Sequence, residues 1–189
     1  MSEVTAVPLR PIAKGSLVKL WVGVAVVLGI GVGAAYYGTH KQVVMAQSPE
    51  DFLASNGKRS GVMTTASGLQ YEVLEAGNGP KPTPADIVRV EYTGKLVSGQ
   101  VFDSTDKKGP AMLPVGGGII PGWTEGLQLM PQGAKYRFWI PPALAYGATG
   151  AGNGVIPPNA ITVFDVKLLE FIPASAMGGM GMNGGHGGM

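Results

Sequence analysis

Apolar and polar side chains alternate along several short segments in the middle of the chain. In residues 87–93, polar Arg89 and Glu91 are interleaved with apolar Val88 and Val90. This period of two is typical of a strand with one buried face. The same signals predict further strands over four segments: 69–74, 101–102, 135–140 and 161–168.

One segment of this region favours a helix. Residues 123–130 allow about two turns before Pro131 ends them. Clusters of glycine and proline, such as those at 77–80 and 141–142, separate the predicted strands. Several strands and one short helix predict an α+β domain over 69–172, in which one face of an antiparallel sheet packs onto the helix.

A long apolar run lies near the amino terminus. Residues 20–39 carry no charge, and a helix of this length, at about 1.5 Å per residue, spans the roughly 30 Å core of a bilayer. Trp21 lies at one end and Tyr36 and Tyr37 at the other, where aromatic rings favour the headgroup region. We predict a transmembrane helix, with a buried core helix as the alternative.

Basic residues before this run predict its orientation. Arg10, Lys14 and Lys19 precede it against one acid, Glu3. By the positive-inside rule, residues 1–19 stay in the cytoplasm and the carboxy-terminal domain lies on the far side of an inner membrane. A cleaved signal peptide has the same charge pattern, but the apolar run is longer than the usual hydrophobic core of a signal peptide. We predict a retained anchor, with a cleaved leader as the alternative.

The segments on either side of the predicted domain have a different composition. Residues 40–68 lack apolar periodicity and predict a linker with at most one short helical turn near 49–54. Residues 173–189 are rich in Gly and Met and predict a disordered tail. Its soft side chains form a candidate Cu(I) site, with a solvated terminus that binds no metal as the alternative. These side chains are Met177, Met180, Met182 and His186.

Composition narrows the chemistry. The formal net charge is +2, without a run of lysine or arginine, so we expect no nucleic-acid partner. There is no cysteine, and both histidines, His40 and His186, lie outside 69–172. The domain therefore has no Ser/His or Cys/His nucleophile and no histidine-based metal site, and we expect no cofactor. The glycines at 116–118 lack the Lys-Ser/Thr pair of a phosphate loop.

The domain is instead rich in aromatic and branched apolar side chains beside Gly, Pro or Asp. Together they can build an apolar pocket with a few polar groups, although each one alone is more typical of a core. The segments concerned are 92–94, 102–103, 119–123, 145–147 and 163–165.

Five motifs resemble, in order and spacing, the signature blocks of FKBP-type prolyl isomerases. They are EYTG at 91–94, GQVFDS at 99–104, IPGWTEGL at 120–127, IPP through AYG at 140–147, and IPPN through VFDV at 156–166. The resemblance covers about a hundred residues. It implies a twisted antiparallel β-sheet wrapped around one short α-helix. It also implies peptidyl-prolyl cis-trans isomerase activity on proline-containing unfolded or partly folded polypeptides.

The resemblance also assigns roles to residues. The implied catalytic residues are Tyr92, Phe102, Asp103, Ile120, Trp123, Tyr146 and Phe164, and the implied substrate-binding residues are Ile119 and Ile156. Trp123 is expected at the pocket floor, and the backbone N–H of Ile120 is expected to donate to a substrate carbonyl. Asp103 and Tyr146 are the expected polar groups. A buried carboxylate without a donor costs several kcal/mol, so we expect Asp103 to accept from a pocket group such as Tyr92.

Two segments depart from the family pattern. Residues 111–113 are Ala-Met-Leu where the family often has an aromatic residue, and the glycine run at 116–118 is about one residue longer. We therefore expect one pocket wall to be more open, which bears on the affinity for the family's macrolide inhibitors, the candidate ligands. A non-catalytic binding or chaperone module on the same fold is the alternative to an isomerase.

Overall fold

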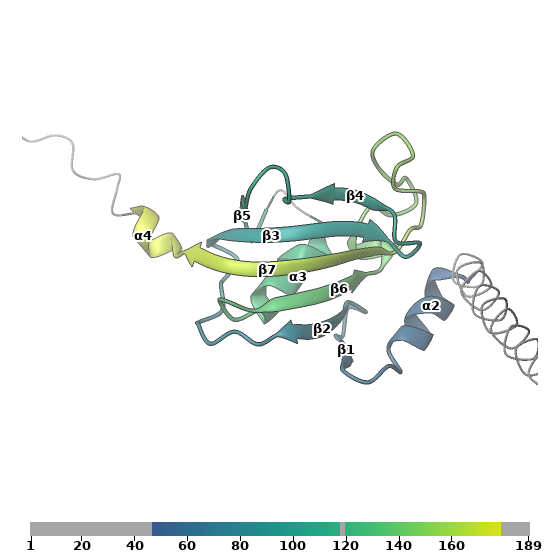
Figure 1. The fold of residues 1–189 in the computed structure, drawn as a ribbon, viewed down its shortest axis with the longest axis horizontal. Helices are drawn as coiled ribbons and strands as arrows, with labels where there is room; N and C mark the ends of the chain where they lie inside the picture. Colours follow the sequence, from purple (N-terminus) through teal and green to yellow (C-terminus); the bar gives the residue numbers. More distant parts are fainter. Residues whose placement is uncertain (1–46, 118–119, 179–189) are drawn as a thin grey trace, which may run out of the picture. The chain divides into compact units, whose positions relative to one another are not determined.

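A computed structural model describes residues 47–117 and 120–178, in which strands dominate and helices are few (Figure 1). The strands are β1 (Val62–Thr64), β2 (Gln70–Glu75), β3 (Ile87–Leu96), β4 (Val101–Ser104), β5 (Ala111–Pro114), β6 (Lys135–Ile140) and β7 (Thr162–Ile172). The helices are α2 (Pro49–Asn56), α3 (Pro121–Leu129) and α4 (Ala174–Gly178), with a 3-10 turn η1 (Pro142–Leu144).

The predicted membrane helix at 20–39 lies outside the described residues. Within 47–117 and 120–178, none of the helices has the length and apolar character needed to cross a bilayer.

The strands form one seven-stranded sheet in the order β1-β2-β6-β7-β3-β4, with β5 also paired to β3. Every pairing is antiparallel. β3 pairs with β7 along ten residues, from Ile87↔Ile172 to Leu96↔Thr162. On its other edge β3 pairs with β4 and β5. The antiparallel sheet expected from the sequence is therefore present.

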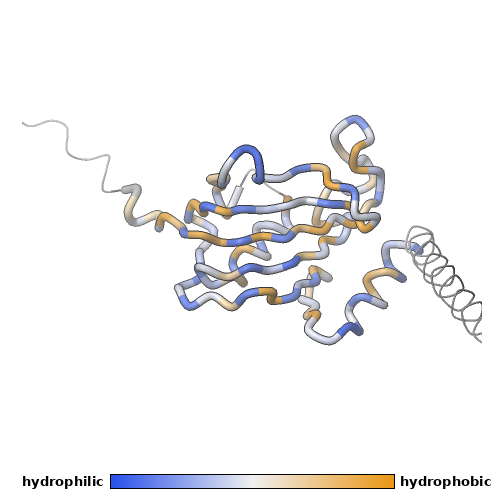
Figure 2. The backbone as a smooth tube through the Cα atoms, viewed as in Figure 1, coloured by the Kyte–Doolittle hydropathy of each residue, from blue (hydrophilic) through white to orange (hydrophobic). Residues whose placement is uncertain are grey.

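Alternation along β3 determines which face of the sheet is buried. Val88 and Val90 are fully buried, whereas Glu91 is exposed. Arg89 forms an ion pair across the outer face with Glu170 of β7, with Nε 2.5 Å from Oε1. Figure 2 shows the same alternation of hydrophobic and hydrophilic positions along the central strands. One face of β3 thus contributes to the core, as its period of two predicts.

Helix α3 supplies the other side of the core. It begins at Pro121, whose missing N–H costs nothing in the first turn. The sequence pattern predicts a start at Trp123, two residues later than the structure shows. Trp123 and Leu127 are buried in one cluster with the inner face of the sheet. A Cβ on Gly126 would lie 2.9 Å from the ring of Phe138 on β6, so glycine permits the close approach of helix and sheet.

Residues 47–64 contain more structure than the short helical turn expected there. α2 has eight residues and is capped by Ser48, the residue before its first, whose Oγ accepts from the Asp51 N–H at 3.1 Å. Asn56 links the end of the helix to β2, because its side-chain amide donates to Gln70 Oε1 at 2.8 Å. Its apolar side chains pack with those of β6, β7 and neighbouring segments in a second cluster. This cluster comprises Phe52, Leu53, Val62, Val97, Trp139, Ile161 and Val163.

The segment after β7 also contains a helix. α4 covers residues 174–178, and the N–H of Ala174 donates to Asp86 Oδ1 at 3.0 Å. This bond connects the segment to the loop before β3. The remainder of the predicted tail, with three of its four candidate copper ligands, lies outside the described residues.

Candidate active site

A cavity of about 400 Å³ contains all the residues that the sequence predicted as catalytic. Its lining residues come from the sheet, from α3 and from the turn after η1. They are Tyr92, Phe102, Asp103, Leu113, Ile120, Trp123, Tyr146 and Phe164. The volume lies within the roughly 300–1,000 Å³ typical of small-molecule sites.

Aromatic rings form the walls and meet edge to face. The Trp123 ring is nearly perpendicular to Tyr92, with centroids 5.1 Å apart, and to Phe164, with centroids 5.3 Å apart. Phe102 meets Phe164 at 83° and 5.5 Å. Rings prefer these edge-on arrangements because the positive edge of one contacts the negative face of another. The walls therefore hold one another in place.

A glycine on β3 makes room for two of these rings. A Cβ on Gly94 would lie 2.7 Å from the ring of Phe164 and 2.8 Å from that of Phe102. Gly94 is directly opposite Asp103 on β4 and Phe164 on β7. The bare backbone at this position thus allows both phenylalanines to pack over β3 beside the cavity.

Asp103 is the carboxylate of the pocket, and three donors satisfy it. Tyr92 Oη donates to Oδ2 at 2.5 Å, while the Ser104 N–H and Lys108 Nζ donate to Oδ1 at 2.9 and 3.1 Å. Burial acts to raise the pKa of Asp103, but the hydrogen bonds from Tyr92 and Lys108 outweigh burial and lower this pKa below its ordinary value. Asp103 is therefore ionised at neutral pH.

The two tyrosines of the pocket stay protonated. Burial raises the pKa of Tyr92, and its hydrogen bond to Asp103 raises it further. Burial also raises the pKa of Tyr146, and the negative charge of Asp103 adds to the effect. Both hydroxyls are thus available as donors at neutral pH, although that of Tyr92 is already committed to Asp103.

Tyr146 and Ile120 are positioned by backbone turns. The N–H groups of Ala145 and Gly147, on either side of Tyr146, both donate to the carbonyl of Pro142, at 3.0 and 2.9 Å. Ile120 is the N-cap residue of α3, with extended backbone at φ −64° and ψ 147°. Its carbonyl accepts from the Trp123 N–H at 2.9 Å. The start of α3 therefore sets the positions of the Ile120 backbone and the Trp123 ring together.

The two predicted substrate-binding residues are not among the described lining residues. Ile156 is buried, with 5% of its surface exposed, and lies in the loop before β7, where it forms a bridge with Ala151. Ile119 lies outside the described residues.

Sequence reasoning missed three residues that contact or support the pocket. Leu113 lines it from β5, and Lys108 pairs with Asp103. Thr105 Oγ1 accepts from the Tyr92 N–H at 2.9 Å and thereby connects β3 to the end of β4. The family comparison placed residues 111–113 at one pocket wall without singling out Leu113; the alternating exposure that distinguishes Ala111 and Leu113 is seen only in the structure.

Acidic and histidine side chains do not gather elsewhere in the described ranges. Among residues 47–117 and 120–178, no three His, Cys, Asp or Glu side chains are grouped closely enough to hold a metal ion. The copper hypothesis for the tail stays a prediction.

Comparisons with known proteins give two family matches. Residues 79–169 match the FKBP-type peptidyl-prolyl cis-trans isomerase family. Residues 38–73 match a domain found amino-terminal to such isomerases.

Two relatives and one solved structure show the extent of similarity. The FKBP-type isomerase FkpA of Aeromonas hydrophila is 52% identical over 130 residues, which are 68% of this chain and 47% of that protein. The outer membrane protein MIP of Legionella longbeachae is 48% identical over 120 residues, 63% of this chain and 51% of that protein. The crystal structure of FkpA from Escherichia coli superposes with a TM-score of 0.63 at 35% identity, covering 86% of this chain and 75% of that one. The chain thus spans about half the length of these two curated relatives.

Proposed function

Because this chain belongs to the FKBP-type peptidyl-prolyl cis-trans isomerase family, we propose that it accelerates rotation about Xaa-Pro bonds in unfolded or partly folded polypeptides. The observation that carries the proposal is the aromatic cavity, lined by Trp123, Tyr92, Phe102 and Phe164. A proline ring is apolar and compact, and it matches such walls. Tyr146 and Asp103 supply the polar groups.

The reaction needs no nucleophile. Rotation about the Xaa-Pro bond faces a barrier of about 20 kcal/mol because the amide loses its resonance, and no bond is made or broken. The twisted amide is less charge-separated than the planar one, so a cavity that excludes water favours it. Binding that is stronger for the twisted form than for the planar form lowers the barrier.

Three groups have separate roles in this mechanism. The N–H of Ile120 and the hydroxyl of Tyr146 donate to the carbonyls that flank the proline and hold the backbone while the bond rotates. Asp103, ionised and held by Tyr92 and Lys108, sets the electrostatic field at the carbonyl that turns. Ile119 and Ile156 are proposed to contact the substrate around the mouth of the cavity.

The test is a coupled assay of a tetrapeptide that contains one Xaa-Pro bond. We expect the full chain to accelerate cis-to-trans conversion, and Trp123→Ala to lose most of the rate because it removes the floor. A parent protein that leaves the uncatalysed rate unchanged, while suppressing aggregation of an unfolded protein, would show a chaperone module without isomerase activity.

We also propose that residues 20–39 anchor the chain in an inner membrane, with the isomerase domain on the extracytoplasmic side. The uncharged run and its basic flank support this placement, and the similarity to the outer membrane protein MIP of Legionella longbeachae agrees with a location in the cell envelope. A compartment-sensitive reporter fused after Ile172 and cell fractionation test it. Reporter activity restricted to the cytoplasm would refute the orientation. Release of a shortened chain into the soluble fraction would refute the retained anchor.

A further inference from the structure

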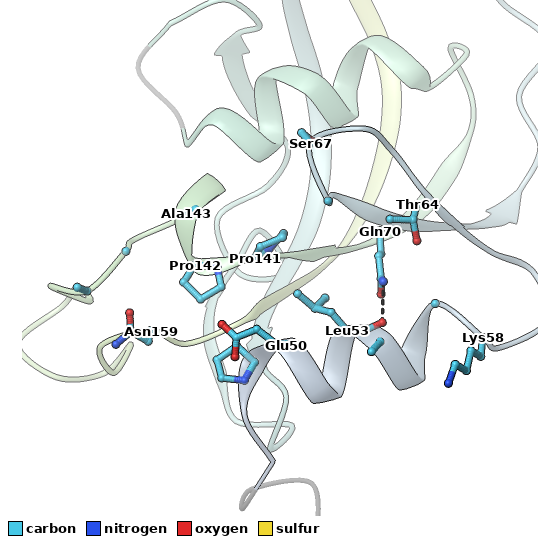
Figure 3. A pocket seen from close by; sticks show the side chains of 16 residues that line it. Glu50, Leu53, Lys58, Thr64, Ser67, Gln70, Pro141, Pro142, Ala143 and Asn159 are labelled. Carbon is cyan, nitrogen blue, oxygen red and sulfur yellow. Dashed lines mark hydrogen bonds between the residues drawn. The ribbon is translucent and has the colours of Figure 1, made fainter.

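A second and larger cavity, of about 1130 Å³, lies along α2 (Figure 3). We refer to it as the α2 groove. Leu53 and Ala54 of α2 line one side, and Pro141, Pro142 and Ala143 line the other. It is an open groove rather than a closed cavity, and Figure 3 shows it following the length of the helix, with Glu50 and Lys58 near opposite ends.

The α2 groove and the catalytic pocket share one structural element. The turn at 141–148 contributes Tyr146 to the catalytic pocket, and Pro142 and Ala148 to the α2 groove. The N–H of Asn159, a further groove residue, donates to the carbonyl of Gly147 at 2.9 Å and connects this turn to the segment before β7. The two cavities are therefore neighbours on one short turn.

The groove has the chemistry of a peptide site. Its apolar surface comes from proline rings and Leu53, and Thr64, Asn159 and the charged Glu50 and Lys58 add polar groups. The α2 wall is fixed, because Gln70 Nε2 donates to the Leu53 carbonyl at 2.8 Å. Apolar walls with a few polar groups on a preformed surface suit a polypeptide segment of mixed composition.

An open strand edge borders the groove. Among the described strands, β1 pairs with β2 alone, and Thr64 of β1 lines the groove. Thr65 donates its N–H to the Leu69 carbonyl at 2.9 Å. Because bonded and non-bonded pairs alternate in an antiparallel ladder, the backbone N–H and C=O of Thr64 point away from β2. Such an edge can hydrogen-bond to an extended chain.

We propose that the α2 groove binds an extended segment of the same client polypeptide whose proline occupies the catalytic pocket. The proposal rests on the isomerase function proposed above. The shared turn makes the two sites neighbours, so one chain can reach both, and the open edge of β1 fits an extended backbone. A tetrapeptide fills the catalytic pocket alone, whereas a longer unfolded chain engages both sites and gains affinity from two linked contacts.

The test compares two variants of neighbouring residues on α2 in the full chain. Ala54 is exposed and lines the groove, so Ala54→Arg fills it with a long side chain while keeping a good helix former. Ser55 is also exposed but is not a lining residue, so Ser55→Arg adds the same charge outside the groove. Ala54→Ser, which keeps the groove open, is the conservative control.

Each variant is assayed with a short and a long substrate. For proline-limited refolding of an unfolded protein, we expect Ala54→Arg to lower kcat/KM by about tenfold, mainly through KM. For the tetrapeptide, we expect it to match the parent. Ser55→Arg and Ala54→Ser should match the parent with both substrates. Fluorescence anisotropy with labelled, reduced and carboxymethylated α-lactalbumin, a permanently unfolded polypeptide, should show a matching loss of affinity with Ala54→Arg alone.

The outcomes separate this inference from the proposed function. Equal refolding rates and equal anisotropy for Ala54→Arg and the parent would overturn the groove as a client site. Sedimentation velocity of the same variants tests the alternative occupant. If Ala54→Arg changes only the sedimentation coefficient, the groove binds a second copy of the chain and the client site is overturned. A parent that fails to accelerate the tetrapeptide refutes the isomerase, whatever the anisotropy shows.

Discussion

Replacing Phe164 with alanine removes a pocket wall and a core side chain together. The ring is 3% exposed and meets Trp123 and Phe102 edge to face. Truncating a buried phenylalanine costs about 3–5 kcal/mol of unfolding free energy. The void would open into the catalytic pocket, where water can enter, so we expect the lower end, about 3 kcal/mol. Isomerase activity should fall as well, because the pocket widens.

Asp103→Leu is the matched comparison. The Asp103 side chain is 40% exposed, so its replacement leaves no buried cavity, and the main cost is the acceptor that the Tyr92 hydroxyl loses, about 1 kcal/mol. We expect kcat/KM to fall about tenfold, equivalent to about 1.4 kcal/mol of transition-state stabilisation. One variant should thus lose stability and activity, and the other mainly activity.

Urea unfolding, followed by circular dichroism, and tetrapeptide isomerisation measure the two effects. A loss below about 1 kcal/mol for Phe164→Ala would contradict the burial of its ring. If Asp103→Leu unfolds the domain but leaves the rate of the folded fraction unchanged, Asp103 is a structural acceptor. If both variants isomerise at the parent rate, the catalytic pocket lies elsewhere.

The same site yields three further predictions. The ordinary pKa of an aspartate is about 3.9 and that of a tyrosine about 10. Because the pKa of Asp103 is lowered and that of Tyr146 raised, kcat/KM should be flat between about pH 5 and 9. The stability that ionised Asp103 contributes should be present above pH 4 and lost as pH falls through its lowered pKa. A rate titration near pH 6 to 7 would contradict this assignment. Gly94→Ala should displace the ring of Phe102 and lower tetrapeptide kcat/KM severalfold, since its Cβ has no space; a parental rate would show that the pocket adapts. If the pocket binds the family's macrolide inhibitors, Leu113→Phe should tighten that binding severalfold in calorimetry, because it adds an aromatic ring to the lining of the cavity; unchanged affinity would show that β5 does not contact the inhibitor.

Strands with strong alternation were predicted well from local pattern. Residues 135–140 were predicted as a strand, and β6 has those bounds. β3 continues past the predicted end at residue 93, because Gly94 to Leu96 keep pairing with β7. Gly94 interrupts the local alternation, so the sequence pattern predicts that the strand ends there. In the structure, pairing with β7, a distant strand, extends β3 beyond the glycine.

Elements without strong local periodicity were missed or predicted too short. β1 is three residues long and is a strand because it pairs with β2. Its own three residues give no local signal for that pairing. α2 had a local signal, in Ser48 before Pro49 with acids in the first turn, but because its amphipathicity is weak only one short turn near 49–54 was predicted. The pocket was predictable through the family resemblance rather than from pattern. Strand register brings Tyr92 and Asp103 together, and neither segment encodes that register alone.

The pairing of β3 with β7 has a consequence for synthesis. Arg89 and Glu170, joined across these strands, are 81 residues apart in the chain. At about 5–20 residues per second, roughly 4 to 16 seconds separate their emergence from a ribosome. Throughout that interval β3 lacks the partner that pairs with it along ten residues, and an unpaired strand with an exposed apolar face is prone to aggregate. The nascent chain is itself, for those seconds, a polypeptide in need of a chaperone.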